Sequence, residues 1–294
     1  MSQTASNEVL LNDPPMMGPP MDFTRPEAGR NGPPSQGDVA KALAKTVSSE
    51  PPVITKAGEA WVDLPGGLIT PEGLLVRKAL VRELNGYDEE RLSRIDMDKN
   101  VAAYVTEMLC MAIDDLGGSK PTKETVRSLL IGDRDALVLG IRAATYGNDV
   151  EFKLNCSKCG NDSEVIVELD KDIKITQMDD PLNRQFTVTL RRGEAKVTLL
   201  TGVAQEAFSA DIGRRTQAEI NTIMLAKSVI SINDVPVQQR EEDVRQLSAA
   251  DRDTLTDFVA EHQPGPQFKE IEVTCATCGA EYPVSLGLSS LFRF

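Results

Sequence analysis

The sequence predicts an α+β fold, in which a mainly helical block is joined to β-hairpins and two of the hairpins carry matching CxxCG motifs. Three observations support this prediction. Apolar residues recur at helical spacing in several segments, for example in residues 101–116. Short runs with alternating apolar residues, such as EVIVELD at 164–170, are typical of strands. Glycine and proline clusters separate these segments, as expected for turns.

Composition limits the kinds of protein that this chain can be. Of its 294 residues 40% are hydrophobic but only 4% aromatic, so a core of Leu, Val, Ile and Ala is expected. The net charge of −13 disfavours binding to nucleic acid, because a negative field repels phosphate backbones. No stretch reaches the ~20 continuous apolar residues of a membrane helix, and the first residues lack a signal-peptide layout. These features predict a protein kept in a reducing cytoplasm.

Residues 1–55 are predicted to form a disordered arm rich in Pro, Gly and Met. Segments such as PPMMGPPMDF show little apolar periodicity, so they cannot bury enough surface to offset the entropy lost on ordering. Residues 37–47 (GDVAKALAKTV) are the exception and fit a short helix. The arm is interpreted either as a flexible tail or as a docking segment that orders on a partner.

Residues 56–150 are predicted to form a strand–helix region. WVDLPGGLIT and LLVRKALVREL fit two strands, with the turn placed at Pro65, Gly66 and Gly67. GYDEERLSRI then fits a short helix. Residues 101–116 fit a longer helix that ends before Gly117.

Two further helices are expected before the first cysteine motif. KETVRSLL follows Thr122, whose hydroxyl is a suitable N-cap. GDRDALVLGIRAATYGND is predicted to be a helix with Asp133 as its N-cap and Gly147 as its stop.

The remainder of the chain is predicted to nest one segment inside another. Residues 151–175 and 266–294 form the hairpins that carry the CxxCG motifs, and residues 176–265 form an insert made of a hairpin plus helices. In the insert, FTVTL and KVTLL fit the two strands of the hairpin. QEAFSADIGRR, QAEINTIMLAKSVISI and LSAADRDTLTDFVAEH fit helices, the last with Ser248 as N-cap, and DVPV fits a small strand.

Three isolated features are expected to be structural. Cys110, in an apolar helix, is interpreted as a small buried hydrophobic residue. His262, the single histidine, lies at the end of a helix and is interpreted as a C-terminal cap. The apolar ending SLGLSSLFRF is expected to pack on the core through Phe292 and Phe294, with presentation to a neighbouring protein as the alternative.

Four of the five cysteines form two CxxCG units, CSKCG at 156–160 and CATCG at 275–279. In a reducing compartment paired cysteines indicate metal ligands more readily than disulfides. The two intervening residues let both thiolates point to one side of a turn, and the following glycine allows a left-handed backbone. Because both units are flanked by strand-like segments, they predict a zinc-ribbon-like pair of CxxCG knuckles. The expected cofactor is a structural zinc ion held by Cys156, Cys159, Cys275 and Cys278.

Alternatives to zinc remain open at this point. An iron site of the rubredoxin kind would use the same four ligands. Thioredoxin-like redox chemistry is disfavoured, because neither motif begins a helix after a βαβ pattern. The cysteines could also be unmetallated or disulfide-linked. The 115 residues between Cys159 and Cys275 are unusually many for such a site, but a folded insert with adjacent ends would make the spacing acceptable.

Several kinds of enzyme are disfavoured by what the sequence lacks. It contains no GxxxxGK[ST], GxGxxG, GxSxG or HExxH motif, and its one histidine leaves little scope for histidine-based acid–base catalysis. The acid pairs at 114–115, 179–180 and 241–242 are interpreted as solvated charge. With four protein ligands the metal would have no open position for water, so the chain is predicted not to be an enzyme.

Several segments together resemble a known family. LPGGLITPEG, LVRELNGYDEERL and above all IRAATYGNDVEFKLNCSKCGNDSEVIVELD are similar to sequences of T4-like bacteriophage base plate proteins, over roughly residues 61–290. The resemblance implies a structural component or assembly factor of a contractile phage tail baseplate hub. It also implies partners among other phage tail baseplate or hub proteins, with a homo-oligomer left open. The location would be the virion tail baseplate, or the host cytoplasm during assembly.

Two other functions are compatible with parts of the sequence. The motif pair is compatible with a zinc-ribbon regulator that binds nucleic acid, although the net charge of −13 opposes it. A thiol-dependent enzyme would require ready disulfide formation within one CxxC unit and no bound metal.

Overall fold

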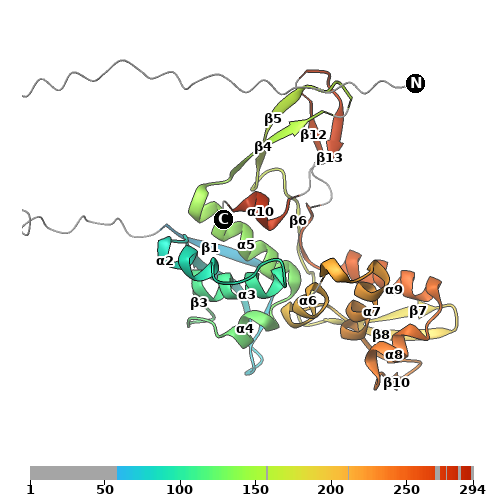
Figure 1. Cartoon of the computed structure of the whole chain (residues 1–294). Coiled ribbons are helices and arrows are strands. Elements are labelled where there is room, and N and C mark those ends of the chain that lie inside the picture. Colours follow the sequence, from blue (N-terminus) through green and yellow to red (C-terminus); the bar gives the residue numbers. More distant parts are fainter. Residues whose placement is uncertain are drawn as a thin grey trace, which may run out of the picture. The chain divides into compact units, whose positions relative to one another are not determined.

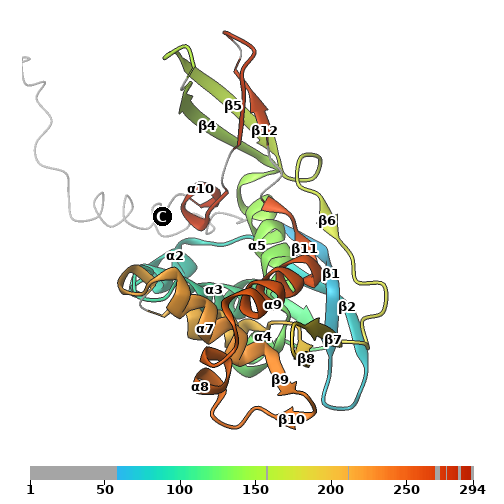
Figure 2. The same cartoon turned by 90° about the vertical axis from the view of Figure 1, so that its right-hand side faces the viewer.

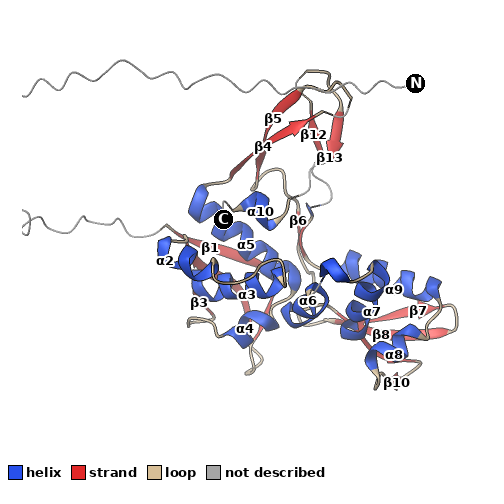
Figure 3. Ribbon diagram, viewed as in Figure 1, coloured by secondary structure: helices blue, strands red, loops and turns tan. Residues whose placement is uncertain are grey.

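A computed structural model describes most of the chain, namely residues 58–156, 158–210, 212–268, 272–275, 277–283 and 286–292. The predicted arm at 1–55 and the helix at 37–47 lie outside the described residues. The described chain combines helices and sheets, as the α+β prediction requires (Figures 1 and 3). The expected mainly helical character is wrong, because strands are substantial in every part of the fold.

The first block is built around a three-stranded antiparallel sheet. Its strands are β1 (Glu59–Ile69), β2 (Leu75–Arg82) and β3 (Ile113–Leu116), in the order β1-β2-β3. The turn predicted at residues 65–67 is wrong, since these residues lie inside β1, where the register with β2 shifts. The glycines there permit a bulge, with φ of 71° at Gly67, and the chain reverses only at residues 70–74.

Four helices pack in the first block. They are α2 (Gly86–Leu92), α3 (Val101–Ala112), α4 (Lys123–Ser128) and α5 (Ile131–Tyr146). The helix predicted at 101–116 ends four residues early, because residues 113–116 leave it and pair with β2. This pairing keeps Ile113 and Leu116 in the core while their backbone groups join the sheet.

Of the two N-caps predicted in the first block, one is correct and one is wrong. Thr122 accepts a hydrogen bond from the Thr125 amide and caps α4 as expected. Leu130, not Asp133, occupies the N-cap position of α5. The Asp133 carboxylate instead accepts the amides of Gly66 and Gly67 at 2.7 and 3.2 Å, and its burial raises its pKa. This acid therefore holds the bulge of β1 and does not cap its own helix.

The insert has its own sheet and core. Strands β7 (Gln185–Leu190) and β8 (Gly193–Thr198) form the predicted hairpin, and β9 (Val229–Ile232) and β10 (Val235–Pro236) extend it in the order β10-β9-β8-β7. The helical elements are α6 (Gly202–Ser209), the 3-10 turn η1 (Ile212–Arg214), α7 (Gln217–Ser228), α8 (Arg240–Arg245) and α9 (Ala249–His262). Ser248 caps α9 as predicted. The helix expected to run on to residue 232 ends at Ser228, where β9 begins.

A buried arginine joins the insert to the first block. Arg134 of α5 is fully buried, and its guanidinium donates to the carbonyls of Ala102 and Val126 and to the side chains of Thr106 and Gln205. Gln205 belongs to α6, and the adjacent Glu206 accepts a hydrogen bond from Thr106 at 2.6 Å. These polar contacts fix α6 against α3 and α5.

The two ends of the insert lie side by side. Strand β6 (Ile175–Thr176) pairs antiparallel with β11 (Gly265–Pro266), so the chain leaves and returns at adjacent positions. Next to this pair α5 crosses the returning chain at Gly132, where an added Cβ would lie 1.6 Å from the Pro264 carbonyl oxygen. Only glycine at position 132 leaves room for this close approach. In the returning chain, the φ of 124° at Gly265 also favours glycine.

This crossing gives a test of the arrangement. Gly132→Ala is expected to lower the free energy of unfolding by about 3 kcal/mol, since the methyl group meets backbone that cannot rotate away. The measurement is a urea titration followed by circular dichroism. Gly86→Ala is the matched control, because an added Cβ there meets no atom within 4 Å. Equal stability of the two variants would show that α5 does not cross the chain so closely.

The C-terminal segment packs on the first block. Helix α10 (Leu288–Leu291) precedes Phe292, which is 2% exposed and meets Tyr146 edge to face, with ring centroids 6.3 Å apart. The packing predicted for Phe292 is confirmed, whereas Phe294 lies outside the described residues.

Candidate metal centre

The first cysteine motif lies at the tip of a hairpin rooted in the core. The hairpin consists of β4 (Asp149–Asn155) and β5 (Asp162–Glu168). Its cross-strand pair Val150–Val167 is buried in the hydrophobic core of the first block. Arg142 of α5 donates to the carbonyls of Gly147 and Asp149 and so fixes the turn that leads into β4. The root of the hairpin is therefore held rigidly, while its tip carries the sulfur atoms.

Both motifs fold into the same knuckle. In the first, the Cys156 amide donates to the Asn161 carbonyl at 3.0 Å and the Gly160 amide donates to the Cys156 carbonyl at 2.8 Å. In the second, which joins β12 (Glu272–Thr274) to β13 (Glu281–Pro283), the equivalent bonds of Cys275 and Gly279 measure 2.8 and 2.9 Å. The φ angles of Gly160 and Gly279 are 71° and 68°. The left-handed glycine expected after each second cysteine is confirmed.

The two hairpins lie side by side although they are far apart in the sequence. In both views the β4–β5 hairpin runs beside the β12–β13 hairpin, with the two knuckles at the same end (Figures 1 and 2). The adjacency of β6 and β11 explains this, because it returns the chain to its starting point after the insert. The insert is folded and its two ends are adjacent, which was the condition for accepting 115 residues between Cys159 and Cys275.

The four sulfur atoms form one cluster. The Sγ atoms of Cys156, Cys159, Cys275 and Cys278 all lie within 4.8 Å of one another. Sulfurs from opposite knuckles approach to 3.7 Å (Cys156–Cys278) and 3.8 Å (Cys159–Cys275). These separations are far longer than a disulfide bond of ~2.05 Å. They match the edge of about 3.8 Å expected for a tetrahedron whose sulfurs lie ~2.3 Å from a central zinc ion. The residues present therefore fit a four-thiolate metal site.

The electrostatics of the cluster favour a bound cation. The amides of Cys159 and Lys158 point at Cys156 and hold the pKa of its thiol below the usual range. For Cys159 the Asn161 amide acts in the same direction, but burial and the neighbouring sulfurs outweigh it and raise its pKa to about 11. Four thiolates at this spacing repel one another, and a metal ion would supply the compensating charge.

The other predicted features do not join this cluster. Cys110 is partly buried against the core of the first block, somewhat less than expected. His262 ends α9, with its Nδ1 2.9 Å from the Phe258 carbonyl oxygen and its ring stacked on Phe258. Asp115 accepts the Gly118 amide, Asp180 accepts the Leu182 amide, and Glu241 pairs with Arg245. These acids are engaged in local structure.

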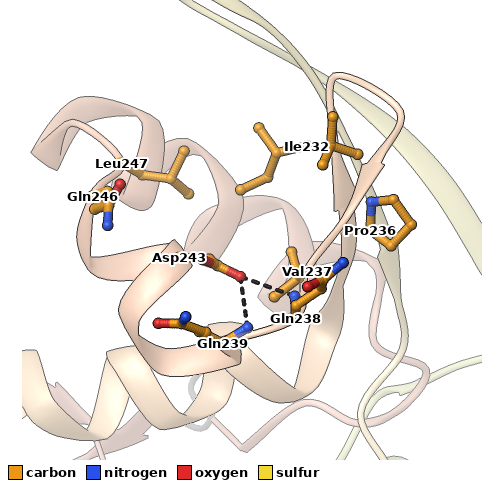
Figure 4. Close-up of a pocket in the computed structure, with 9 residues that line it drawn as sticks. Ile232, Pro236, Val237, Gln238, Gln239, Asp243, Gln246 and Leu247 are labelled. Carbon is orange, nitrogen blue, oxygen red and sulfur yellow. Dashed lines mark hydrogen bonds between the residues drawn. The ribbon is translucent and has the colours of Figure 1, made fainter.

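A cavity in the insert offers no catalytic set among its lining residues. It holds about 490 Å³ between the β9–β10 turn and α8, and Figure 4 shows Asp243 pointing into it. The Asp243 carboxylate accepts the amides of Gln238 and Gln239, both at 2.9 Å, so it orders the chain before α8. The rest of the lining is apolar or carries side-chain amides.

Comparison with known proteins decides the family. A model of the family described as T4 bacteriophage base plate protein matches residues 81–293, which include all four clustered cysteines. The chain belongs to this family. The resemblance seen in the sequence is confirmed, and membership supports a structural role in a phage baseplate. No curated protein and no solved structure matches the chain.

The family is one of structural proteins, which suggests a function other than catalysis. Among the helices that the structure describes, none is long and apolar enough to cross a membrane.

Proposed function

We propose that this chain is a structural component or assembly factor of the baseplate hub in a contractile phage tail. The observation that carries the proposal is the family match together with the four-sulfur cluster it contains. A metal ion held by Cys156, Cys159, Cys275 and Cys278 would clip the two hairpins into one rigid unit. Such a unit keeps its shape while other tail proteins add to it. Its partners are other baseplate or hub proteins, and the homo-oligomeric state is left to experiment.

The proposed metal is zinc, in a site of the zinc-ribbon kind. Zinc takes four thiolates in tetrahedral geometry, and the sulfur separations support that arrangement. Iron would use the same ligands, so the purified chain must be assayed by elemental analysis and by its visible spectrum. One zinc per chain and no visible absorption are expected. A red protein with bound iron would contradict the assignment of zinc.

The nucleic-acid alternative is weaker, because the knuckle hairpins are not basic. Lys153 on β4 is paired with Glu164 on β5 at 3.4 Å, and Glu151, Asp162 and Glu168 add further negative charge. A surface of this sign repels phosphates. The chain is expected to leave DNA and RNA unshifted in a gel at micromolar protein and near-physiological salt. A salt-dependent shift would favour the regulator instead.

The experiment that tests the function is quantitative mass spectrometry of intact tail particles and of immature tail complexes. A fixed ratio to the hub subunits in finished particles would identify a structural component. Presence in immature complexes alone would identify an assembly factor. Absence from both fractions would overturn the proposed function.

A further inference from the structure

A small pocket lies on the first block, away from the sulfur cluster. It holds about 160 Å³ and is bounded by α3, α5, α6 and the segment around α10. Apolar side chains form most of its wall, among them Val105, Val138, Phe268 and Leu288. Among the lining residues that the structure describes, Gln205 and Asp135 have polar side chains, and Asp135 is the one that carries a charge.

Asp135 is partly buried, and it differs from the buried acids of this protein in having no hydrogen-bonding or ion-pairing partner among the described residues. Asp88 pairs with Arg82, Asp133 accepts two backbone amides, and Asp251 accepts the Arg191 amide. Asp135 makes no hydrogen bond or ion pair with any residue in the described part of the chain. Burial raises its pKa to about 7, as expected for a carboxylate held among apolar groups.

Arg134 attracts the Asp135 carboxylate electrostatically but makes no hydrogen bond with it. Arg134 is its neighbour in sequence, but its guanidinium is committed to four acceptors on α3, α6 and the chain near Val126. None of the lining residues from the segment around α10, which are 286–288 and Leu291, has a charged side chain. A partly desolvated carboxylate with no hydrogen-bond donor keeps acceptor capacity that a cationic ligand can use.

We propose that this pocket binds a lysine side chain of a partner protein, with the methylene groups between the apolar walls and the ammonium on the Asp135 carboxylate. The apolar walls suit an alkyl chain, and one carboxylate in the lining suits a compact ammonium. A guanidinium is the poorer fit, because its five donors would meet a single acidic acceptor. The identity of the partner as another tail protein rests on the proposed function. The chemical fit between the pocket and a lysine side chain is independent of that function.

The test uses n-butylammonium as the probe and n-butanol as its neutral counterpart, titrated into the full chain and followed by NMR at about pH 8, where an acid with a pKa of about 7 is ionised. The ammonium is expected to bind at least about tenfold more tightly than the alcohol, the difference that a charge-assisted hydrogen bond supplies. Asp135→Asn, which keeps the shape of the side chain, should abolish the preference. Asp253→Asn, at an exposed acid of α9, is the matched control and should retain it. At about pH 5.5 the preference should shrink in the parent chain, because Asp135 binds a proton there.

Three outcomes would overturn the proposal. Equal binding of the two probes would show that Asp135 recruits no cation, and a preference that survives Asp135→Asn would place the cation elsewhere. A preference that is unchanged at about pH 5.5 would show that the ionised Asp135 carboxylate is not its source. None of these outcomes depends on tail membership, so they are distinguishable from failure of the proposed function.

Discussion

The Cys156→Ser variant is expected to lose bound metal and to unfold well below the parent chain. Serine is a poor ligand at neutral pH, and metal binding is coupled to folding, with apparent values on the order of 10 kcal/mol in small zinc peptides. Because the metal would join hairpins 115 residues apart in the sequence, we expect a loss of more than about 3 kcal/mol. Thermal unfolding and metal content of the purified variant are the measurements.

Two companion variants keep this result interpretable. Cys156 is 1% exposed, so its substitution also disturbs packing, whereas Cys278 is exposed and Cys278→Ser removes a ligand with little effect on packing. Both variants should lose metal and stability together, and a strong chelator should do the same to the parent chain. Cys110→Ser, outside the cluster, should keep its metal. Unchanged unfolding of Cys278→Ser with no metal bound would show that the site does not support the fold.

The Arg134→Met variant is expected to be the most destabilising change outside the cysteine cluster. Methionine fills much of the volume but leaves the carbonyls of Ala102 and Val126 without their buried donor, and it frees α6 from α5. Removal of a buried, hydrogen-bonded charge costs about 3–5 kcal/mol. Chemical denaturation followed by circular dichroism measures the loss.

The matched control is Arg94→Met, at an exposed arginine after α2. Its free energy of unfolding should stay within about 0.5 kcal/mol of the parent value. If Arg134→Met were equally mild, the buried guanidinium would contribute no net stability, and α6 would be held by its other contacts alone.

Local signals in the sequence predicted the parts of the fold that local chemistry decides. Thr122 and Ser248 cap helices because a hydroxyl can reach amides three residues ahead, whatever the surroundings. The CxxCG units form matching knuckles for the same reason, since the glycine and one hydrogen bond lie within each motif and a second hydrogen bond reaches the residue directly after it. Each pair of cysteines was therefore predictable from its own motif, whereas the meeting of the two pairs follows from the pairing of β6 with β11.

Errors arose where partners distant in sequence decide the structure. Residues 113–116 continue an apolar helical pattern, but pairing with β2 makes them a strand. Residues 229–232 leave α7 in the same way when they pair with β8. Asp133 has the chemistry of an N-cap, yet the glycine amides of β1, 66 and 67 residues away, take its carboxylate. Propensity is a weak guide when tertiary pairing competes with it.

The charged residues at the start of α5 were the main feature missed in the sequence. Asp133, Arg134 and Asp135 are consecutive, so they cannot all lie on one exposed face of a helix. The apolar residues that follow offered a signal, since a helix buried on several sides must bury some of these charges. That signal would have indicated Asp133 and Arg134 as structural residues and Asp135 as a candidate binding residue.

The pairing of β6 with β11 has a consequence for how this protein can vary between phages. The segment from residue 176 to residue 265 begins and ends at paired positions, so its two ends are as close together as those of a short turn. Substitutions, insertions or exchanges in the part of the segment beyond α6, around α7 to α9, leave the separation of the two knuckles unchanged. Sequence drift in this part of the chain can thus reshape one surface of the protein while the four-cysteine cluster keeps its geometry.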